Sequence, residues 1–250
     1  MGSLLASITY SIIITRRATG WFALLVCEMP KPKAFPKTGK TVGVDVGIKD
    51  FCTLSTGEVI ANPKHLSQAA DNLAKLQRRL SRKVKGSANR AKARKKVALA
   101  HLKVSNTRKD FHHKLSTRLV NEFDVISVEA LNVRKMVRDR NFSKAILDVA
   151  WSQFFTITQN KAGNAGRDFV KNNPAFTSQT CSKCGHRQKM PLAVRIFDCQ
   201  NCDHIQDRDH NAANNLNNMT ERVKIYACGE RDSVSVKQER VIETCATPAG

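Results

Sequence analysis

Acidic residues are scarce in this chain of 250 residues, since 21 Asp and Glu stand against 42 Lys and Arg, for a formal net charge of +21. A positive surplus of this size repels itself unless a polyanion lies nearby. Nucleic acid is therefore the leading candidate partner. An acidic membrane surface is the alternative, but no lipidation motif and no lipid-facing amphipathic segment supports it. We expect no membrane association.

Long apolar runs are missing as well, because no stretch reaches the length that crosses a bilayer. The apolar start, LLASITYSIII, lacks a basic leader and is soon interrupted by Arg16 and Arg17, so it does not resemble a secretory signal. We therefore expect a cytoplasmic protein. In that reducing compartment the eight cysteines should bind metal or stay free.

Several catalytic templates are absent from the sequence. It contains no Gly-x-x-x-x-Gly-Lys phosphate loop, no Gly-x-Ser-x-Gly elbow and no His-Glu-x-x-His motif. Of its two tyrosines, Tyr10 lies in the first predicted strand and Tyr226 near the tail, so neither is placed as a nucleophile for strand transfer. His112 and His113 lie in a basic helix without a companion, which favours a surface or packing role. The cysteines and the carboxylates are the remaining candidate functional residues.

β-Structure is predicted in three regions. Residues 7–28 favour a hairpin that turns at 17–20, and a Pro- and Lys-rich linker follows it. A meander of three strands comes next, from the segments 41–47, 51–54 and 58–61. Farther along, residues 124–129 predict a strand, and Phe169 begins a short one.

Two helical regions are predicted. In the first, residues 65–84 form one helix, Gly86 breaks the pattern, and a second helix extends to about Val120 as its antiparallel partner. One stripe of the second helix should face inward: Val97, His101, Val104, Phe111, Leu115 and Leu119. The other region is a helix at 143–163, whose aromatic residues Trp151, Phe154 and Phe155 should pack in the core.

Most of the positive charge lies on the predicted helical hairpin. Between Lys75 and Lys114 there are fifteen Lys or Arg residues and one acid, Asp110. Ion pairs between successive helical turns cannot explain a face with so few acids. A merely solvated helix face is the alternative, but we expect this hairpin to contact a nucleic-acid backbone.

Four cysteines have the spacing of a structural zinc site. Cys181 and Cys184 form one Cys-x-x-Cys pair, Cys199 and Cys202 form another, and fourteen residues separate the pairs. Each pair can present two thiolates from one tight turn, and four thiolates fill a tetrahedral coordination sphere. A redox pair or inert thiols are the alternatives. His186 and His204 stand beside the pairs as possible substitute ligands.

Carboxylates stand at three positions that suggest a shared site. Asp45 lies within an apolar strand, Glu129 ends another strand, and Asp207 and Asp209 precede a helix start at Asn211. Taken singly, each could be a turn former or a helix cap. If they converge, their repulsion raises their pKa values, and two divalent ions remove that cost. Two such ions can activate a water and stabilise the leaving oxygen of a phosphodiester. Hard carboxylate oxygens favour Mg²⁺ or Mn²⁺ over zinc.

Four motifs, in this order, resemble the TnpB family. They are GVDVGIKDF (43–51), ISVEALNV (126–133), TSQTCSKCG (177–185) and DRDHNAANNL (207–216). The family consists of transposon-encoded proteins, often labelled OrfB-type transposases, which are similar to the type V CRISPR effector nucleases. The resemblance extends from about residue 7 to the C-terminus and includes the ACGE…VKQE tail at 227–239.

The resemblance implies an α/β fold, namely an RNase H-like, RuvC-type mixed sheet with a basic helical hairpin insertion and a C-terminal zinc ribbon. It also implies a metal-dependent DNA endonuclease of a prokaryotic cell, with guide RNA and DNA as partners. By position, Asp45 and Glu129 match the first two catalytic carboxylates, which bind Mg²⁺ or Mn²⁺. Asp209 matches the third, with Asp207 as runner-up. The zinc ligands match Cys181, Cys184, Cys199 and Cys202.

The same resemblance divides the chain into segments. We expect a remnant of a wedge-like β-barrel at 1–29, a linker at 30–40, a RuvC-like core at 41–176 with the basic hairpin at 65–120, a zinc ribbon at 177–206, the last RuvC segment at 207–222 and a tail at 223–250. Family members are usually longer at the N-terminus, so we expect this chain to be a truncated copy, a fragment or an internally initiated product. The nuclease function has two alternatives, namely a non-cleaving nucleic-acid-binding protein and a zinc-ribbon accessory protein of ribosomes or transcription.

Overall fold

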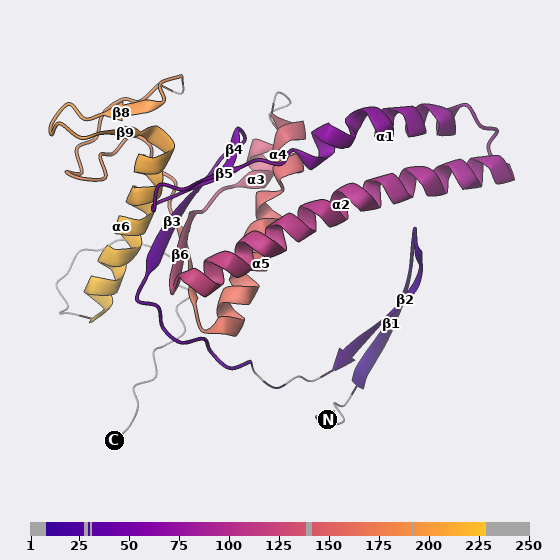
Figure 1. Cartoon of the computed structure of the whole chain (residues 1–250), viewed down its shortest axis with the longest axis horizontal. Coiled ribbons are helices and arrows are strands. Elements are labelled where there is room, and N and C mark those ends of the chain that lie inside the picture. The colour runs from indigo at the N-terminus through magenta and orange to yellow at the C-terminus, as the bar shows by residue number, and fades with distance from the viewer. Residues whose placement is uncertain (1–8, 28–29, 31, 139–141, 192, 229–250) are drawn as a thin grey trace.

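The computed structural model describes residues 9–27, 30, 32–138, 142–191 and 193–228. A five-stranded mixed sheet lies at its centre (Figure 1). The strands are β3 (Thr41–Val46), β4 (Asp50–Leu54), β5 (Val59–Ala61), β6 (Val125–Glu129) and β7 (Asp168–Asn172), in the spatial order β5-β4-β3-β6-β7. β3 to β5 pair antiparallel, whereas β6 and β7 join the sheet in parallel. The mixed, RNase H-like sheet is thus confirmed.

Helices cover both faces of this sheet. On one face, α2 (Ala88–Glu122) and α5 (Trp151–Ala165) contribute buried Leu119 and Phe154 to the main hydrophobic core, where they meet Val42 and Val44 of β3. On the other face lies α6 (Arg208–Cys228), which follows the small antiparallel ribbon of β8 (Ile196–Asp198) and β9 (Ile205–Asp207) (Figure 1). Successive side chains of β3 point to opposite faces of the sheet, so its valines face α2 and α5 and the residues between them face α6.

Gly43 permits close contact between β3 and α6. A Cβ built at this position would overlap the carbonyl oxygen of Ala213 and lie 2.8 Å from the backbone nitrogen of Asn217. Any side chain here would push α6 away from the sheet. Since α6 carries Asp209 in its first turn, the missing side chain of Gly43 helps to set the position of that carboxylate.

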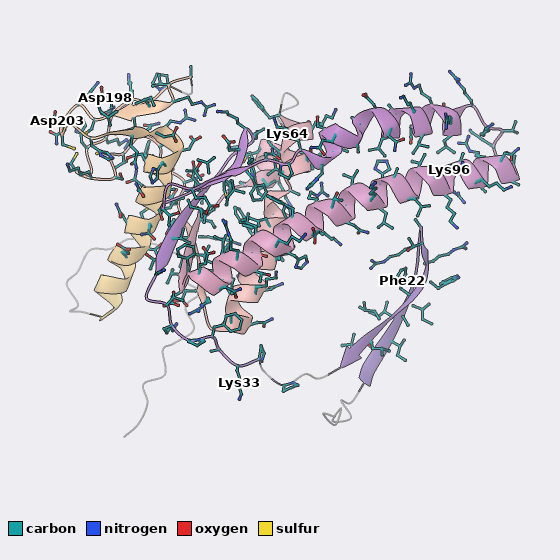
Figure 2. The ribbon with its side chains drawn as sticks, in the orientation of Figure 1. Phe22, Lys33, Lys64, Lys96, Asp198 and Asp203 are labelled. Atoms are coloured by element: carbon teal, nitrogen blue, oxygen red, sulfur yellow. The ribbon has the colours of Figure 1, made fainter. Side chains whose placement is uncertain are left out.

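The basic helical hairpin is confirmed. It consists of α1 (His65–Ser81) and α2, which run side by side and project from the sheet (Figure 1). Figure 2 shows Lys64 near the sheet and Lys96 on the part of α2 that lies far from the sheet. The inward stripe was partly wrong, because His101 is exposed whereas His112 is fully buried between Phe51 and Phe154. His112 thus has the packing role expected for it.

The predicted helix at 143–163 is two helices, which corrects that expectation. α4 (Ser143–Val149) ends at Ala150, whose φ of 54° is left-handed, and α5 begins at Trp151. Residues two apart cannot share one face of a continuous helix. The break lets both Val149 and Trp151 reach the core, where they are 3% and 2% exposed. A short helix, α3 (Val133–Met136), was not predicted.

Residues 36–39 are tied to the edge of the sheet by Asp124. The backbone N–H groups of Thr38 and Gly39 donate to its carboxylate at 2.8–3.0 Å. Buried Arg167 also donates to Asp124, and to the carbonyl oxygen of Pro36 at 2.7 Å. These hydrogen bonds, that of the Thr38 backbone above all, lower the pKa of Asp124 to about 2.

The predicted N-terminal hairpin is confirmed as β1 (Thr9–Arg17) and β2 (Gly20–Cys27), which lies apart from the central sheet in Figure 1. Its apolar side chains are exposed on both faces, for example Ile14 at 69% on one face and Leu24 at 54% on the other. The predicted tail lies outside the described residues from 229 onward. Within the described part of the chain, no helix is both long and apolar enough to cross a bilayer.

Candidate active site and metal centre

Asp45 and Glu129 lie side by side on adjacent parallel strands. The register of β3 and β6 pairs Val44 with Val128, so the next residue on each strand is a carboxylate. Both strands are otherwise mostly buried and apolar, and the two acids lie at or next to their carboxyl ends. As expected, Asp45 lies within its strand, which ends at Val46, and Glu129 is the last residue of β6.

Asp209 comes from the first turn of α6, which begins at Arg208 rather than at Asn211 as predicted. Asp207 provides the start of this helix, because its carboxylate accepts the backbone N–H groups of Asp209 and His210 at 2.9 and 3.1 Å. That is the geometry of an N-cap. Asp207 is exposed, and its hydrogen bonds give it a structural role. Asp209 is the carboxylate that turns toward the sheet.

One open cleft of about 780 Å³ contains all three carboxylates. Asp45, Glu129 and Asp209 line it together with Trp151 and Thr177. Its basic lining residues are Lys49, Lys64, Arg195 and Arg208. The cleft therefore combines acidic and basic side chains, which suits a phosphate group brought to bound cations.

Burial and mutual repulsion govern the acids in this cleft. Burial raises the pKa of Asp45 well above its ordinary value, and the charges of Glu129 and Asp209 raise it further, whereas Arg208 lowers it. The pKa of Glu129 is also raised by burial. Carboxylates that resist ionisation in this way gain stability when a cation joins them.

Each of the other two carboxylates has a specific partner. The Thr177 hydroxyl donates to Glu129 Oε1 at 2.6 Å, which partly offsets the rise that burial causes in the pKa of Glu129. Asp209 is contacted by Arg208 Nε at 3.3 Å and by Arg195 Nη1 at 3.6 Å. Thr177 and the two arginines were not predicted as site residues, although Thr177 opens the TSQTC motif that carried the family resemblance.

The carboxylate site fits hard divalent cations by its donor set. Buried, mutually repelling carboxylate oxygens are the ligands that Mg²⁺ and Mn²⁺ prefer. The three acids do not form a closed cluster, however, because the four cysteines are the one group of potential ligands within 4.8 Å of one another among the residues described. An open arrangement leaves space for water and substrate oxygens.

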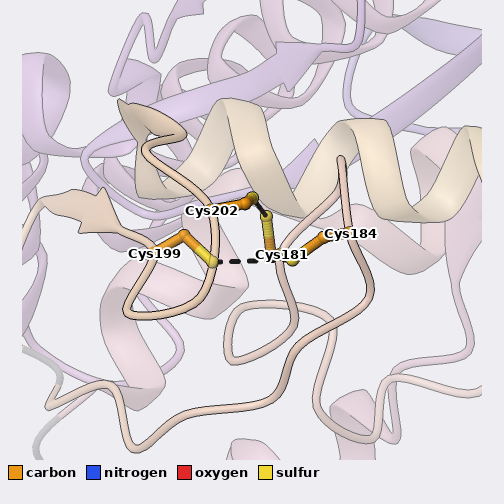
Figure 3. A group of neighbouring side chains, drawn as sticks. All are labelled: Cys181, Cys184, Cys199 and Cys202. Carbon is orange, nitrogen blue, oxygen red and sulfur yellow. Dashed lines mark hydrogen bonds between the residues drawn. The ribbon is translucent and has the colours of Figure 1, made fainter.

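The four cysteines converge as the spacing predicted (Figure 3). Cys181 Sγ lies 3.8 Å from Cys202 Sγ, and Cys184 Sγ lies 3.6 Å from Cys199 Sγ. A tetrahedral zinc ion with bonds of about 2.3 Å places its sulfur ligands about 3.8 Å apart. The backbone N–H of His186 lowers the pKa of Cys184 to about 6, so this ligand ionises readily. The cluster fits zinc.

The ribbon is fastened to α6 by a row of asparagines. Asn211 Nδ2 and Asn215 Nδ2 both donate to the carbonyl oxygen of Thr180 at 2.7 Å, and Asn218 Nδ2 donates to that of Ser182 at 3.0 Å. These asparagines follow each other at helical spacing on one face of α6. Their spacing in the sequence was a usable signal for this contact. The ribbon, α6 and Asp209 thus form one connected unit.

The histidines beside the cysteine pairs do not complete the cluster. His204 Nε2 lies 3.2 Å from Gln206 Oε1 and 3.4 Å from Ser182 Oγ. The backbone carbonyl of His186 accepts a hydrogen bond from Cys181 N at 2.8 Å. Among the described residues, the group that could hold a metal ion here consists of the four cysteines and includes neither histidine.

Two family models match the chain. OrfB_IS605, described as a probable transposase, matches residues 24–140, and the Cas12f1-like TNB domain matches residues 151–216. The first covers the strands of Asp45 and Glu129 together with the basic hairpin. The second covers the cysteine ribbon and the start of α6.

Similar proteins carry related names. A protein of Streptomyces pristinaespiralis, named as a candidate RNA-guided DNA endonuclease, is 43% identical over 93% of this chain and 60% of its own length. The similarly named InsQ of Escherichia coli is 29% identical over 88% of this chain and 58% of its own length. The TnpB-like protein L79 of Acanthamoeba polyphaga mimivirus is 29% identical over 78% and 40%. The chain thus spans about 60% of the length of its Streptomyces relative.

Solved structures share the fold. A Cas12f1–sgRNA–target DNA complex aligns with a TM-score of 0.50 at 21% identity, over 84% of this chain and 56% of the other. A CRISPR–Cas12f ternary complex aligns with a TM-score of 0.52 at 22% identity, over 85% and 46%. Motif order, sheet topology, cysteine cluster and these similarities agree. The chain belongs to the TnpB family of OrfB-type, transposon-encoded proteins.

Proposed function

We propose that this chain is the catalytic part of a metal-dependent, RNA-guided DNA endonuclease. The observation that carries the proposal is that Asp45, Glu129 and Asp209, from three separate elements, line one cleft. The raised pKa values of Asp45 and Glu129 support it, because such a group is stabilised by bound cations. An accessory zinc-ribbon protein would have no use for this arrangement.

Within this proposal each residue has a defined task. Asp45, Glu129 and Asp209 would hold Mg²⁺ or Mn²⁺, and bound ions of this kind activate water and stabilise the leaving oxygen of a phosphodiester. Thr177 orients the Glu129 carboxylate through its 2.6 Å hydrogen bond. Arg195 and Arg208 hold the Asp209 carboxylate through their ionic contacts with it. Lys49 and Lys64, which also line the cleft, would attract the phosphate backbone.

The basic hairpin would bind a second part of the nucleic acid, at a distance from the cleft. A groove between α1 and α2 is lined by Arg79, Lys83, Lys92 and Lys96. We assign this groove to the backbone of a guide–target heteroduplex or of the displaced strand. Base pairing with a guide RNA would then read the sequence, while the protein contacts phosphates without sequence preference.

We assign a structural role to zinc at Cys181, Cys184, Cys199 and Cys202. A ribbon with so small a core depends on its metal for folding. The buried hydrophobic cluster of the ribbon contains one aromatic residue, Phe197. The asparagine row then transmits this order to α6 and Asp209. The division into hairpin, linker, core, ribbon and tail follows the same proposal.

The test is Mg²⁺-dependent scission of single-stranded and duplex DNA, with and without the RNA transcribed from the same element. Asp45→Asn and Asp209→Asn should each abolish cleavage. Asp207→Asn is the matched control, because asparagine keeps the N-cap but removes the charge of the runner-up carboxylate. Cleavage that survives Asp45→Asn and Asp209→Asn would show that the site is assigned wrongly.

A second candidate function is nucleic-acid binding without cleavage. The charge of the α1–α2 hairpin favours it independently of the cleft. Tight, salt-sensitive binding to the RNA of the element, with no scission in Mg²⁺ or Mn²⁺, would establish it.

A further inference from the structure

Phe176 combines an unfavourable backbone conformation with an exposed aromatic ring. Its φ of 67° lies in the left-handed region, which bulky residues rarely adopt. The residue is 44% exposed and belongs to neither buried hydrophobic cluster of the described chain. Local conformational preference and core packing therefore both fail to explain a phenylalanine here. A strained residue beside a candidate active site calls for a functional explanation.

A cation lies against this ring. The guanidinium carbon of Arg187 is 3.0 Å from the centroid of the Phe176 ring. The backbone holds the pair together, since Thr180 and Arg187 form an antiparallel bridge. One side of the ring is thus occupied by a planar cation, while much of the residue remains open to solvent. Stacked aromatic and guanidinium planes are the surfaces on which unpaired bases stack.

The turn that carries the ring is held in place by hydrogen bonds. The carbonyl oxygen of Phe176 accepts the N–H groups of Gln179 and Thr180 at 2.9 and 3.1 Å. Asn215 Nδ2, from α6, donates to the carbonyl oxygen of Thr177 at 2.8 Å. The ring is therefore presented from a fixed backbone, which lowers the entropy lost when a ligand stacks on it.

Phe176 is also next in sequence to residues that line the carboxylate cleft. Pro174, Thr177 and Ser178, on both sides of it in the sequence, line that cleft. Its neighbour Thr177 is 3% exposed and binds Glu129 directly. A base stacked on Phe176 would belong to a nucleotide close to the phosphate at the carboxylates.

We propose that Phe176 and Arg187 form a stacking site for one base of the single DNA strand that enters the cleft. The proposal rests on the proposed function in taking DNA as the ligand. Phe176 supplies a planar face that accepts any base, and Arg187 fixes the ring and adds positive charge near the adjacent phosphate. The pair therefore positions the strand without reading its sequence.

The test compares two single-stranded probes in the full chain without Mg²⁺. One is oligodeoxythymidylate, and the other is an abasic oligomer with the same number of phosphates. Phe176→Asn removes the ring but suits the left-handed backbone, so the protein should melt at or above the temperature of the wild type. This variant should bind oligodeoxythymidylate about tenfold more weakly than the wild type does. Its affinity for the abasic oligomer should be unchanged.

Two further variants separate stacking from packing. Phe176→Tyr keeps the ring and should bind like the wild type, whereas Phe176→Leu keeps apolar bulk and should lose affinity for oligodeoxythymidylate alone. Equal losses on both probes, or no loss on either, would overturn the stacking site. Because binding is measured without Mg²⁺, a chain that fails to cleave DNA can still show the effect of the ring. A chain that cleaves but shows no such effect retains the proposed function without this site.

Discussion

The Thr177 hydroxyl donates a 2.6 Å hydrogen bond to the Glu129 carboxylate. This bond joins the entrance of the zinc ribbon to the end of β6, two places far apart in the sequence. Burial raises the pKa of Glu129, and the hydrogen bond opposes that shift by stabilising the ionised form. The ribbon thus influences one proposed metal ligand directly and Asp209 through α6.

Thr177→Val should weaken Mg²⁺ binding by roughly tenfold at neutral pH, in line with the loss of a hydrogen bond to a charged group. Without the donor, the pKa of Glu129 rises further, so protons compete better with the metal and the loss shrinks at higher pH. The readout is the Mg²⁺ concentration that gives half of the metal-induced rise in melting temperature. Thr177→Ser keeps the hydroxyl and should behave like the wild type. An unchanged valine variant would contradict the role of Thr177.

Gly43→Ala should destabilise the protein by about 1–3 kcal/mol or more, because the new methyl group overlaps the backbone of α6. Gly163→Ala in α5 is the matched control, since its Cβ would meet nothing within 4 Å. That control should be neutral or stabilise by up to about 1 kcal/mol through helix propensity. Urea unfolding measures both. Equal stabilities for the two variants would show that α6 does not need the close approach.

Asp45→Asn should raise the stability of the Mg²⁺-free protein. Because the folded pKa of Asp45 lies above its unfolded value, the folded state holds the proton more tightly. The contribution of Asp45 to stability is therefore greatest below its unfolded pKa of about 4 and falls as the pH rises through its folded pKa. The asparagine variant should lack this decline. Melting temperatures from pH 4 to 8, with zinc at one equivalent, test this, and a variant that melts lower throughout would refute it.

Removal of zinc should lower DNA cleavage even with Mg²⁺ in excess. The four thiols hold the ribbon, and Asn211 and Asn215 connect the ribbon to the helix of Asp209. A thiol-directed reagent that releases zinc should therefore reduce the rate, and zinc with reductant should restore it. Cys184→Ser should show the same reduced cleavage rate without the reagent. Full cleavage by zinc-free protein would show that the ribbon does not position Asp209.

Asp124 should give the protein an acid-sensitive step. Its pKa is lowered to about 2 by hydrogen bonds from Thr38 and Gly39 and by Arg167. This contribution to stability is complete above the unfolded pKa of about 4 and is lost as the pH falls toward the folded pKa. Asp124→Asn should thus be less stable than the wild type at neutral pH, and the difference should vanish near pH 2. A constant difference across the acid range would argue against this linkage.

Local chemistry in the sequence was sufficient for several features. The two Cys-x-x-Cys pairs specify their own ligand set, since each pair comes from a single turn. The valine-rich segments around Asp45 and Glu129 predict buried strands, because residues that pack on both faces of a strand must all be apolar. The density of Lys and Arg on the helical hairpin needs no tertiary information. The prediction of one continuous helix at 143–163 was wrong because nothing in the pattern marks Ala150 as left-handed.

The tertiary structure decided how these pieces meet. The parallel register of β3 and β6 sets Asp45 beside Glu129, and the close approach at Gly43 brings Asp209 to the same cleft. Asp207 and Asp209 stand in one sequence motif but differ in their contacts, because Asp207 caps the start of α6. Thr177 gains its role only through Glu129, a residue on another element. Such contacts depend on packing between distant segments, which one-dimensional periodicity cannot express, whereas ligand spacing, strand burial and charge are properties of neighbouring residues.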